Sequence, residues 1–174
     1  MNDKEIRSKI LPFLKNKNCK LVQEFFICDG INIADIALIS KDEIIGYEIK
    51  SDVDTFERFP LQKESYEKTF DKNYLIVGEK YSNIDIPNGW GFIVVTKNKI
   101  EIKQLPKINI NVSSMSLLEL LWKNELKLLL KRKNIKGYSN ANRRVLRTVI
   151  NSNFNIKEIK EYVLETLLNR EYWK

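Results

Sequence analysis

The sequence predicts an α/β protein, with a core in residues 1–106 and a basic helical extension packed on it in residues 107–174. Two observations carry this prediction. Up to Pro106, short apolar segments typical of strands are interspersed with segments in which apolar residues recur every three or four positions, as in helices. Beyond Pro106 only helical patterns continue. The expected order of the core is α-β-β-β-α-β, which alone is compatible with α/β or α+β architecture.

The first helix is expected over residues 2–17, where Ile6 and Ile10 recur at helical spacing. Asn2 or Asp3 is a suitable N-cap, and Pro12 is expected to shorten or kink the helix. Three strands are expected next, at residues 20–27, 31–39 and 43–51, with turns at Asp29-Gly30 and Lys41-Asp42.

The second helix is expected to begin near Asp54 and to run to about Phe70. Asp54, Thr55 and Glu57 have the spacing of a capping box, and Pro60 suits a first helical turn. A buried strand is then expected at residues 74–78, followed by a hairpin of residues 90–96 and 99–105 around Lys97-Asn98.

Three helices are expected in the extension, at residues 114–133, 139–150 and 156–173. In the first of them, one face is apolar and the opposite face carries lysines. The apolar face holds Leu118, Leu121, Trp122 and Leu129, and the lysines are Lys123, Lys127 and Lys131.

Charge is distributed unevenly along the chain. Residues 1–114 hold 17 basic and 17 acidic side chains, whereas residues 115–174 hold 13 basic and 6 acidic ones, so the extension carries the whole net charge of +7. This asymmetry favours an anionic partner such as nucleic acid, although a solvated lysine-rich surface explains it equally well.

Composition excludes several classes of protein. The chain has no histidine, which excludes Ser-His-Asp and Cys-His hydrolases and HExxH zinc enzymes. Cys19 and Cys28 form no metal-binding or disulfide pattern, so we expect free thiols. The charged N-terminal segment and the absence of a long apolar run predict a cytoplasmic protein without a membrane segment.

Acidic and basic side chains interrupt two of the predicted strands. Asp35 lies among apolar residues in one, and Glu48 and Lys50 share one face of the next. If these strands form a hairpin, Asp35 and Glu48 can approach each other, and Mg²⁺ would relieve their repulsion. A neighbouring lysine could then assist a water that attacks a phosphodiester. From spacing alone, a backbone-bonded Asp35 and a solvent-facing pair of Glu48 and Lys50 explain the pattern at least as well.

Asp35 followed by Glu48-Ile49-Lys50 resembles the signature of the PD-(D/E)xK nuclease superfamily, which has a restriction-endonuclease-like fold. The element order agrees, and the sequence is similar to a branch of small stand-alone bacterial and phage proteins that are mostly uncharacterised. The resemblance implies a mixed sheet flanked by helices and hydrolysis of DNA in repair, recombination or defence. Mg²⁺ would be the cofactor, with Mn²⁺ able to substitute, and RNA stays open as a substrate. The resemblance also allows a homodimer.

The resemblance also implies roles for single residues. Asp35 and Glu48 would bind the metal together with the backbone carbonyl of Ile49, and Lys50 would assist the attacking water. Gln62 and Tyr66, one helical turn apart, match a Gln-x-x-x-Tyr element of exonuclease-like members. An additional acid would be Glu24 or, as a second option, Glu5, and Asn32 stands where an arginine is expected.

The sequence leaves the roles of the basic residues of the extension and of two tryptophans open. The phosphate-contact candidates in the extension are Lys131, Arg132, Lys133, Arg143, Arg144 and Arg147, with solvated surface as the alternative. Trp90 and Trp122 are expected to pack in the core, although an exposed one could stack on a base. The alternative functions are a catalytically silent module on a nuclease fold, which binds nucleic acid or a protein, and a basic adaptor for an acidic protein.

Overall fold

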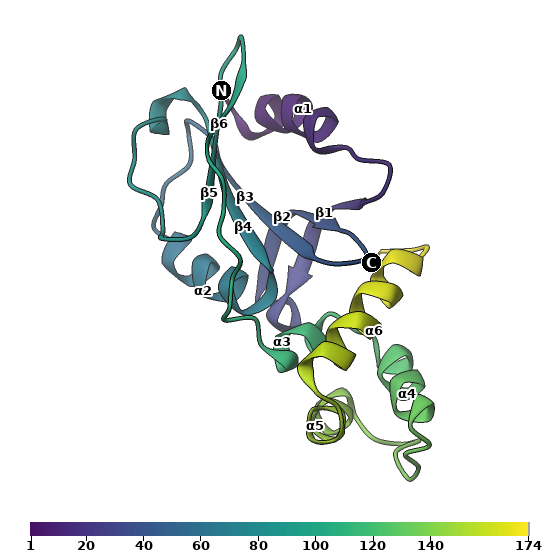
Figure 1. The fold of residues 1–174 in the computed structure, drawn as a ribbon. Coiled ribbons are helices and arrows are strands. Elements are labelled where there is room, and N and C mark those ends of the chain that lie inside the picture. The colour runs from purple at the N-terminus through teal and green to yellow at the C-terminus, as the bar shows by residue number, and fades with distance from the viewer. Residues whose placement is uncertain (174) are drawn as a thin grey trace.

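The computed structural model describes residues 1–173 as a six-stranded sheet with helices on both faces (Figure 1). The strands lie in sequence order across the sheet. The elements are α1 (Asp3–Leu14), β1 (Lys20–Ile27), η1 (Cys28–Gly30), β2 (Asn32–Ile39), β3 (Ile44–Lys50), α2 (Phe59–Thr69), β4 (Lys72–Val77), η2 (Glu79–Tyr81), β5 (Gly91–Val95), β6 (Ile100–Gln104), α3 (Ser114–Glu119), α4 (Lys123–Arg132), α5 (Arg143–Asn153) and α6 (Ile156–Asn169).

The sheet is mixed, which confirms the expected class of α/β fold with an N-terminal helix. Strands β1, β2 and β3 form an antiparallel meander. Strand β4 then pairs in parallel with β3 and β5, and β6 returns antiparallel to β5. All six strands were expected from the sequence within a few residues of their observed bounds.

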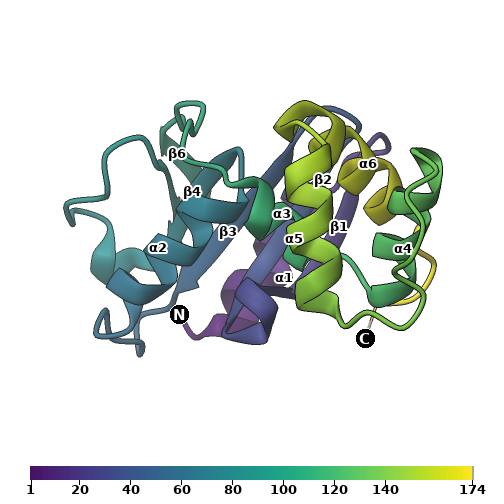
Figure 2. The ribbon, with the colours of Figure 1, turned by 90° about the horizontal axis from the view of Figure 1, so that it is seen from below.

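Two apolar layers hold the sheet between its helices. Ile6 and Ile10 of α1 pack with Ile36, Tyr47 and Ile49 on one face. On the other face, α2 and the C-terminal helices share a single apolar cluster with the remaining inward side chains of the sheet. Helix α6 packs against β2, and α2 against β1 and β2, whereas α5 packs on α3 and α4. Figure 2 shows these helices from below.

The predicted start of the second helix was wrong. The carboxylate of Asp54 accepts hydrogen bonds from the backbone and hydroxyl of Ser51, at 2.8 and 2.7 Å, and so holds a turn before the helix. Helix α2 begins at Phe59, with Pro60 in its first turn and no side-chain cap from Arg58. Of the two caps predicted for α1, Asn2 is confirmed and Asp3 is not, because Asn2 and Glu5 form a reciprocal capping box there.

Gly46 brings α2 close to the sheet. A methyl group at this position would lie 2.3 Å from the ring of Phe70, which packs directly over the strand. Asp71, the residue after Phe70, accepts a hydrogen bond from Ile44 N (2.9 Å) with its carboxylate, and its backbone N–H donates to Ile44 O (2.9 Å). The C-terminal end of α2 is therefore fastened to the start of β3.

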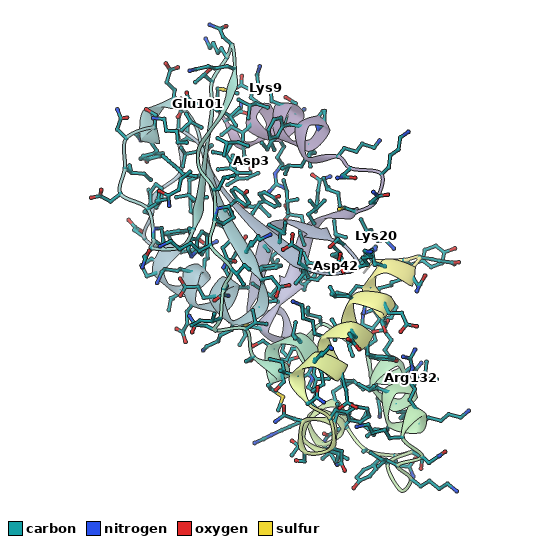
Figure 3. The ribbon with its side chains drawn as sticks, in the orientation of Figure 1. Asp3, Lys9, Lys20, Asp42, Glu101 and Arg132 are labelled. Atoms are coloured by element: carbon teal, nitrogen blue, oxygen red, sulfur yellow. The ribbon has the colours of Figure 1, made fainter. Side chains whose placement is uncertain are left out.

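Within residues 107–173 the extension contains four helices, where three were expected. Residues 114–133 were predicted as one helix, but the chain turns at Leu120–Trp122 because Glu125 accepts a hydrogen bond from Trp122 N (2.6 Å) and starts α4 anew. Side chains tie the extension to the sheet: Lys160 binds Asp71 at 2.6 Å, and Lys20 donates to Leu168 O at 3.1 Å. Figure 3 shows Lys20 beside the end of α6. Because one apolar cluster includes both parts, residue 106 marks no break in the core.

Within residues 1–173, no helix combines the length and the apolar composition that crossing a bilayer requires.

Candidate functional site

The site lies where the hydrogen-bonded ladder between β2 and β3 ends. The last pair in register is Ile36 with Tyr47, and Asp35 and Glu48 are the next residues along their strands. Here the ladder is replaced by a side chain, because Asp35 Oδ2 accepts a hydrogen bond from Ile49 N at 2.7 Å. The two strands therefore present the two predicted acids at the same level of the sheet.

Glu48 and Lys50 form a buried ion pair. Lys50 Nζ donates to Glu48 Oε1 and to Gln62 Oε1, both at 2.8 Å, and the two charged residues expose only 1% and 7% of their surface. The alternative of a solvent-facing strand pair is thus wrong. Gln62 reaches Lys50 from α2, so three of the four residues predicted to be catalytic are in direct contact.

Tyr66 joins the two acids. Its hydroxyl donates to Glu48 Oε2 (2.7 Å) and accepts from the backbone N–H of Asp35 (3.2 Å), with Tyr47 O as a second acceptor at 3.1 Å. The side chain is fully buried, and burial together with the charge of Glu48 raises the pKa of Tyr66 well above its usual value. Tyr66 therefore remains a neutral donor, placed by α2 one turn after Gln62.

Arg7 of α1 completes the group and was missed from the sequence. Its guanidinium donates to Asp3 (2.8 Å), to Asp35 Oδ1 (2.6 Å) and to Asp35 O (3.1 Å), and its Nη2 lies 2.9 Å from Glu24 Oε1. The sequence signal that could have identified Arg7 is its position next to Ile6, because Ile6 packs α1 on the sheet. An arginine was expected near this point from the strand, at Asn32, but there the Asn32 amide instead binds Ser65 Oγ at 2.6 Å.

Glu24 faces Asp35 across the β1–β2 pair, at a break in the alternation of β1. Its φ of 52° is left-handed, which costs about 1–2 kcal/mol for a residue with a side chain. Val22 and Phe25, three residues apart, consequently point into the same apolar cluster. The strained backbone brings the carboxylate of Glu24 to Arg7, whereas the other candidate acid, Glu5, caps α1 through Asn2 N (2.8 Å).

Asp35 is the acid whose proton affinity is most altered. Burial, reinforced by the negative charge of Glu48, raises the pKa of Asp35 to about 7, against the opposing effects of the Ile49 N–H and Arg7. At neutral pH its carboxyl group is thus divided between the protonated and ionised forms.

The basic candidates of the extension differ in their environments. Arg147 is buried and both its terminal nitrogens bind Asp29, which argues against its predicted phosphate contact. Arg143 lies 3.3 Å from the same carboxylate and is half-exposed. Two others are engaged in ion pairs on the surface: Arg132 with Glu165 (2.9 Å) and Lys133 with Glu158 (2.8 Å). Lys131 and Arg144 are exposed and have no salt bridge within residues 1–173.

The site offers two carboxylates as ligands for a hard dication. Residues 1–173 contain no cluster of three or more acidic, histidine or cysteine side chains at metal-binding distance. Mg²⁺, however, is commonly held by one or two carboxylates, with waters and phosphate oxygens as its other ligands. Asp35 and Glu48 fit that mode, and Arg7 and Lys50 already place positive charge at the same carboxylates. For Ile49, the observed contact uses the backbone N–H, and the proposed carbonyl ligand stays a prediction.

Comparisons with known proteins identify relatives over the whole chain. A family model described as bacteriophage P4 protein cII matches residues 1–174. Protein cII of Enterobacteria phage P4 is 23% identical over 181 residues, an alignment that covers 98% of this chain and 68% of the phage protein. Among solved structures, SPO1766, a protein of unknown function from Silicibacter pomeroyi, aligns with a TM-score of 0.46 and 15% identity, covering 72% of this chain and 86% of its own.

Proposed function

The chain belongs to the bacteriophage P4 protein cII family, and we propose that it is a metal-dependent nuclease that hydrolyses phosphodiester bonds in DNA. One observation carries the proposal. Asp35 and Glu48 follow the last paired residues of two neighbouring strands, and Tyr66 joins them by donating to the carboxylate of Glu48 and accepting from the backbone N–H of Asp35. Lys50 in turn links Glu48 to Gln62. The resemblance to the PD-(D/E)xK superfamily supports the same reaction.

Each side chain has a chemical task in this proposal. Asp35 and Glu48 would hold Mg²⁺ or Mn²⁺, which would activate a water and neutralise the scissile phosphate. Lys50 Nζ would orient the attacking water and stabilise negative charge, while Gln62 fixes the direction of its proton donors. Tyr66 would keep Glu48 in position through its Oε2. The pathway would be DNA repair, recombination or defence.

The test is cleavage of labelled single-stranded, duplex, nicked and branched DNAs in Mg²⁺ or Mn²⁺. Glu48→Gln and Lys50→Met keep the size of the buried side chains, and circular dichroism verifies that each variant is folded. We expect cleavage that requires the metal and falls at least a hundredfold in both variants. Glu101→Ala, which removes an exposed acid from the edge strand β6, is the matched control and should cleave like the wild type. Metal-dependent cleavage that survives in both site variants would refute the assignment.

Arg7 favours a second candidate, a catalytically silent module that binds nucleic acid on the same fold. Its guanidinium neutralises Asp35 and Glu24 without any metal. Calorimetry with Mg²⁺ and Mn²⁺ separates the two functions: a nuclease binds the metal through Asp35 and Glu48, whereas a silent module binds DNA equally well in EDTA and takes up no metal.

A further inference from the structure

A cleft of about 440 Å³ opens beside the site, between β1 and the extension. Its volume is in the range of sites that bind small molecules or single groups of a polymer. Glu24 lines the cleft and also contacts Arg7, so the cleft and the acids of the site share a side chain. The cleft is also lined by Asp29, Glu119, Trp122, Arg143, Arg170 and Trp173.

Trp122 gives the cleft an exposed aromatic surface. The side chain is 39% exposed, although it is among the largest apolar groups of the chain. The guanidinium of Arg170 lies 4.2 Å from the centre of its ring and is fixed by two hydrogen bonds to Glu125, at 3.0 and 2.6 Å. Arg170 therefore holds Trp122 in place from one face of its ring, while the residue as a whole remains partly accessible.

The cleft also has polar groups that no protein contact fully satisfies. Burial raises the pKa of Glu119, and no hydrogen bond involves its carboxyl group within residues 1–173. Within residues 1–173, the buried indole N–H of Trp173 has no hydrogen-bond acceptor. Arg143 is held only loosely, at 3.3 to 3.4 Å from its oxygen partners, with nearly half of its side chain exposed.

These features select the chemistry of the ligand. Three carboxylates, from Glu24, Asp29 and Glu119, line the cleft, so the group that enters it must be neutral, and any anionic part of the ligand must lie outside it, beside Arg143. A flat, neutral group with hydrogen-bond donors matches the aromatic surface and the acceptor of Glu119. If it were linked to a phosphate, that phosphate could meet Arg143 at the exposed rim. The base of an unpaired nucleotide is flat and neutral, carries hydrogen-bond donors and is linked to a phosphate.

We propose that this cleft binds an unpaired base of the DNA strand, stacked on Trp122, so that the substrate is single-stranded or frayed next to the scissile phosphate. The proposal rests on the proposed nuclease function for its substrate, although base binding itself requires no catalysis. In a duplex, the faces of the bases are already stacked and cannot contact Trp122. A preference for single strands follows directly from this geometry.

The experiment measures binding in EDTA, where no hydrolysis competes. A fluorescein-labelled 12-nucleotide single strand of mixed sequence and the corresponding labelled blunt duplex are each titrated with the full chain, and the fluorescence anisotropy of the label measures binding. We expect the single strand to bind at least tenfold more tightly than the duplex. Trp122→Leu should weaken binding of the single strand about tenfold, whereas Trp122→Phe, which keeps a stacking surface, should retain most of the affinity.

Leu128→Ala is the matched control, because it removes another exposed apolar side chain from the same region without touching the cleft. Equal affinities for both DNA forms, or an unchanged affinity in Trp122→Leu, would overturn the proposal. If Trp122-dependent binding is found but Mg²⁺ supports no cleavage, the base-binding cleft stands and the nuclease function fails. If cleavage is found without any effect of Trp122, the nuclease stands and the cleft assignment fails.

Discussion

Lys50 Nζ lies 2.8 Å from Glu48 Oε1, and both side chains are almost completely buried. Removal of one partner leaves an uncompensated charge in the interior, so Lys50→Met or Glu48→Gln should lower the free energy of unfolding, by about 3–5 kcal/mol for a lost charge partner. Urea denaturation followed by circular dichroism measures the change. The double variant Glu48→Gln/Lys50→Met buries neither charge and should recover at least half of the loss.

A strictly additive loss in the double variant would contradict a direct coupling between these two charges. Lys99→Met provides the comparison, since Lys99 pairs with Glu101 on the surface at 2.7 Å. Exposed pairs contribute little because water screens them, so this control should change stability only slightly.

The raised pKa of Asp35 predicts a pH dependence of stability. Because the folded protein holds this proton up to about pH 7, whereas the unfolded chain releases it near 3.8, the folded state binds more protons between these values. Stability attributable to Asp35 is thus fully present below pH 3.8 and is lost as pH rises towards 7. Asp35→Asn cannot titrate, so the stability difference between variant and wild type should shift in favour of the variant from pH 4 to 7.

The measurement is the free energy of unfolding at several pH values in this interval, compared as slopes. Asp42→Asn, which changes an exposed acid in the turn between β2 and β3, is the control and should preserve the wild-type slope. Parallel pH profiles of wild type and Asp35→Asn would show that the proton affinity of Asp35 is not altered by folding.

Arg7 and a bound dication would compete for the same carboxylate oxygens. Arg7→Met removes the positive charge of Arg7. It should raise the affinity for Mn²⁺ about tenfold, because the bound metal ion is then no longer next to a guanidinium. Electron paramagnetic resonance of free Mn²⁺ measures this affinity without any need for activity. Lys9→Met removes a charge from the same helix, where Lys9 binds only Lys97 O, and should leave the affinity unchanged. A weaker affinity in Arg7→Met would mean that Arg7 assembles the site instead of competing there.

Two arginines of α5 should separate folding from DNA binding. Arg147 is buried against Asp29, so Arg147→Met should lower stability, by about 1–3 kcal/mol because the carboxylate left behind is partly exposed. Arg144 is exposed, so Arg144→Ala should leave stability unchanged while it weakens DNA binding and reduces the salt dependence of affinity by about one ion. Fluorescence anisotropy between 50 and 200 mM salt tests this, and an unchanged salt slope would remove Arg144 from the proposed interface.

Much of the fold follows from local patterns. Short apolar segments marked all six strands, and Asn2 was one of the two caps expected at the start of α1. The break at Trp122 was missed because Leu118, Leu121 and Leu129 continue one helical pattern across it, and only the capping contact of Glu125 shows that a new helix begins. The start of α2 was misplaced because Asp54 binds Ser51, although its spacing fits a cap.

The site was predicted in part for a similar reason. Asp35, Glu48 and Lys50 lie on adjacent strands, so their proximity could be inferred from a hairpin register. Arg7 approaches Asp35 from a separate helix 28 residues away, and no local period encodes that contact. The burial of Arg147 likewise depends on a partner 118 residues distant, so charge counting along the chain could not distinguish it from Arg144.

At the end of the β2–β3 pair, a side-chain oxygen of Asp35 takes the place of a backbone acceptor, so the amide of Ile49 reports on the state of that carboxyl group. Because Ile49 N donates to a titratable oxygen rather than to a backbone carbonyl, the protection of this one amide against hydrogen exchange depends on the charge of Asp35. Protonation, metal binding or substrate would each alter its exchange rate, while the amides of the intact ladder would change little. The end of the β2–β3 pair would therefore open locally without unfolding of the sheet, and the exchange rate of the Ile49 amide would measure that opening.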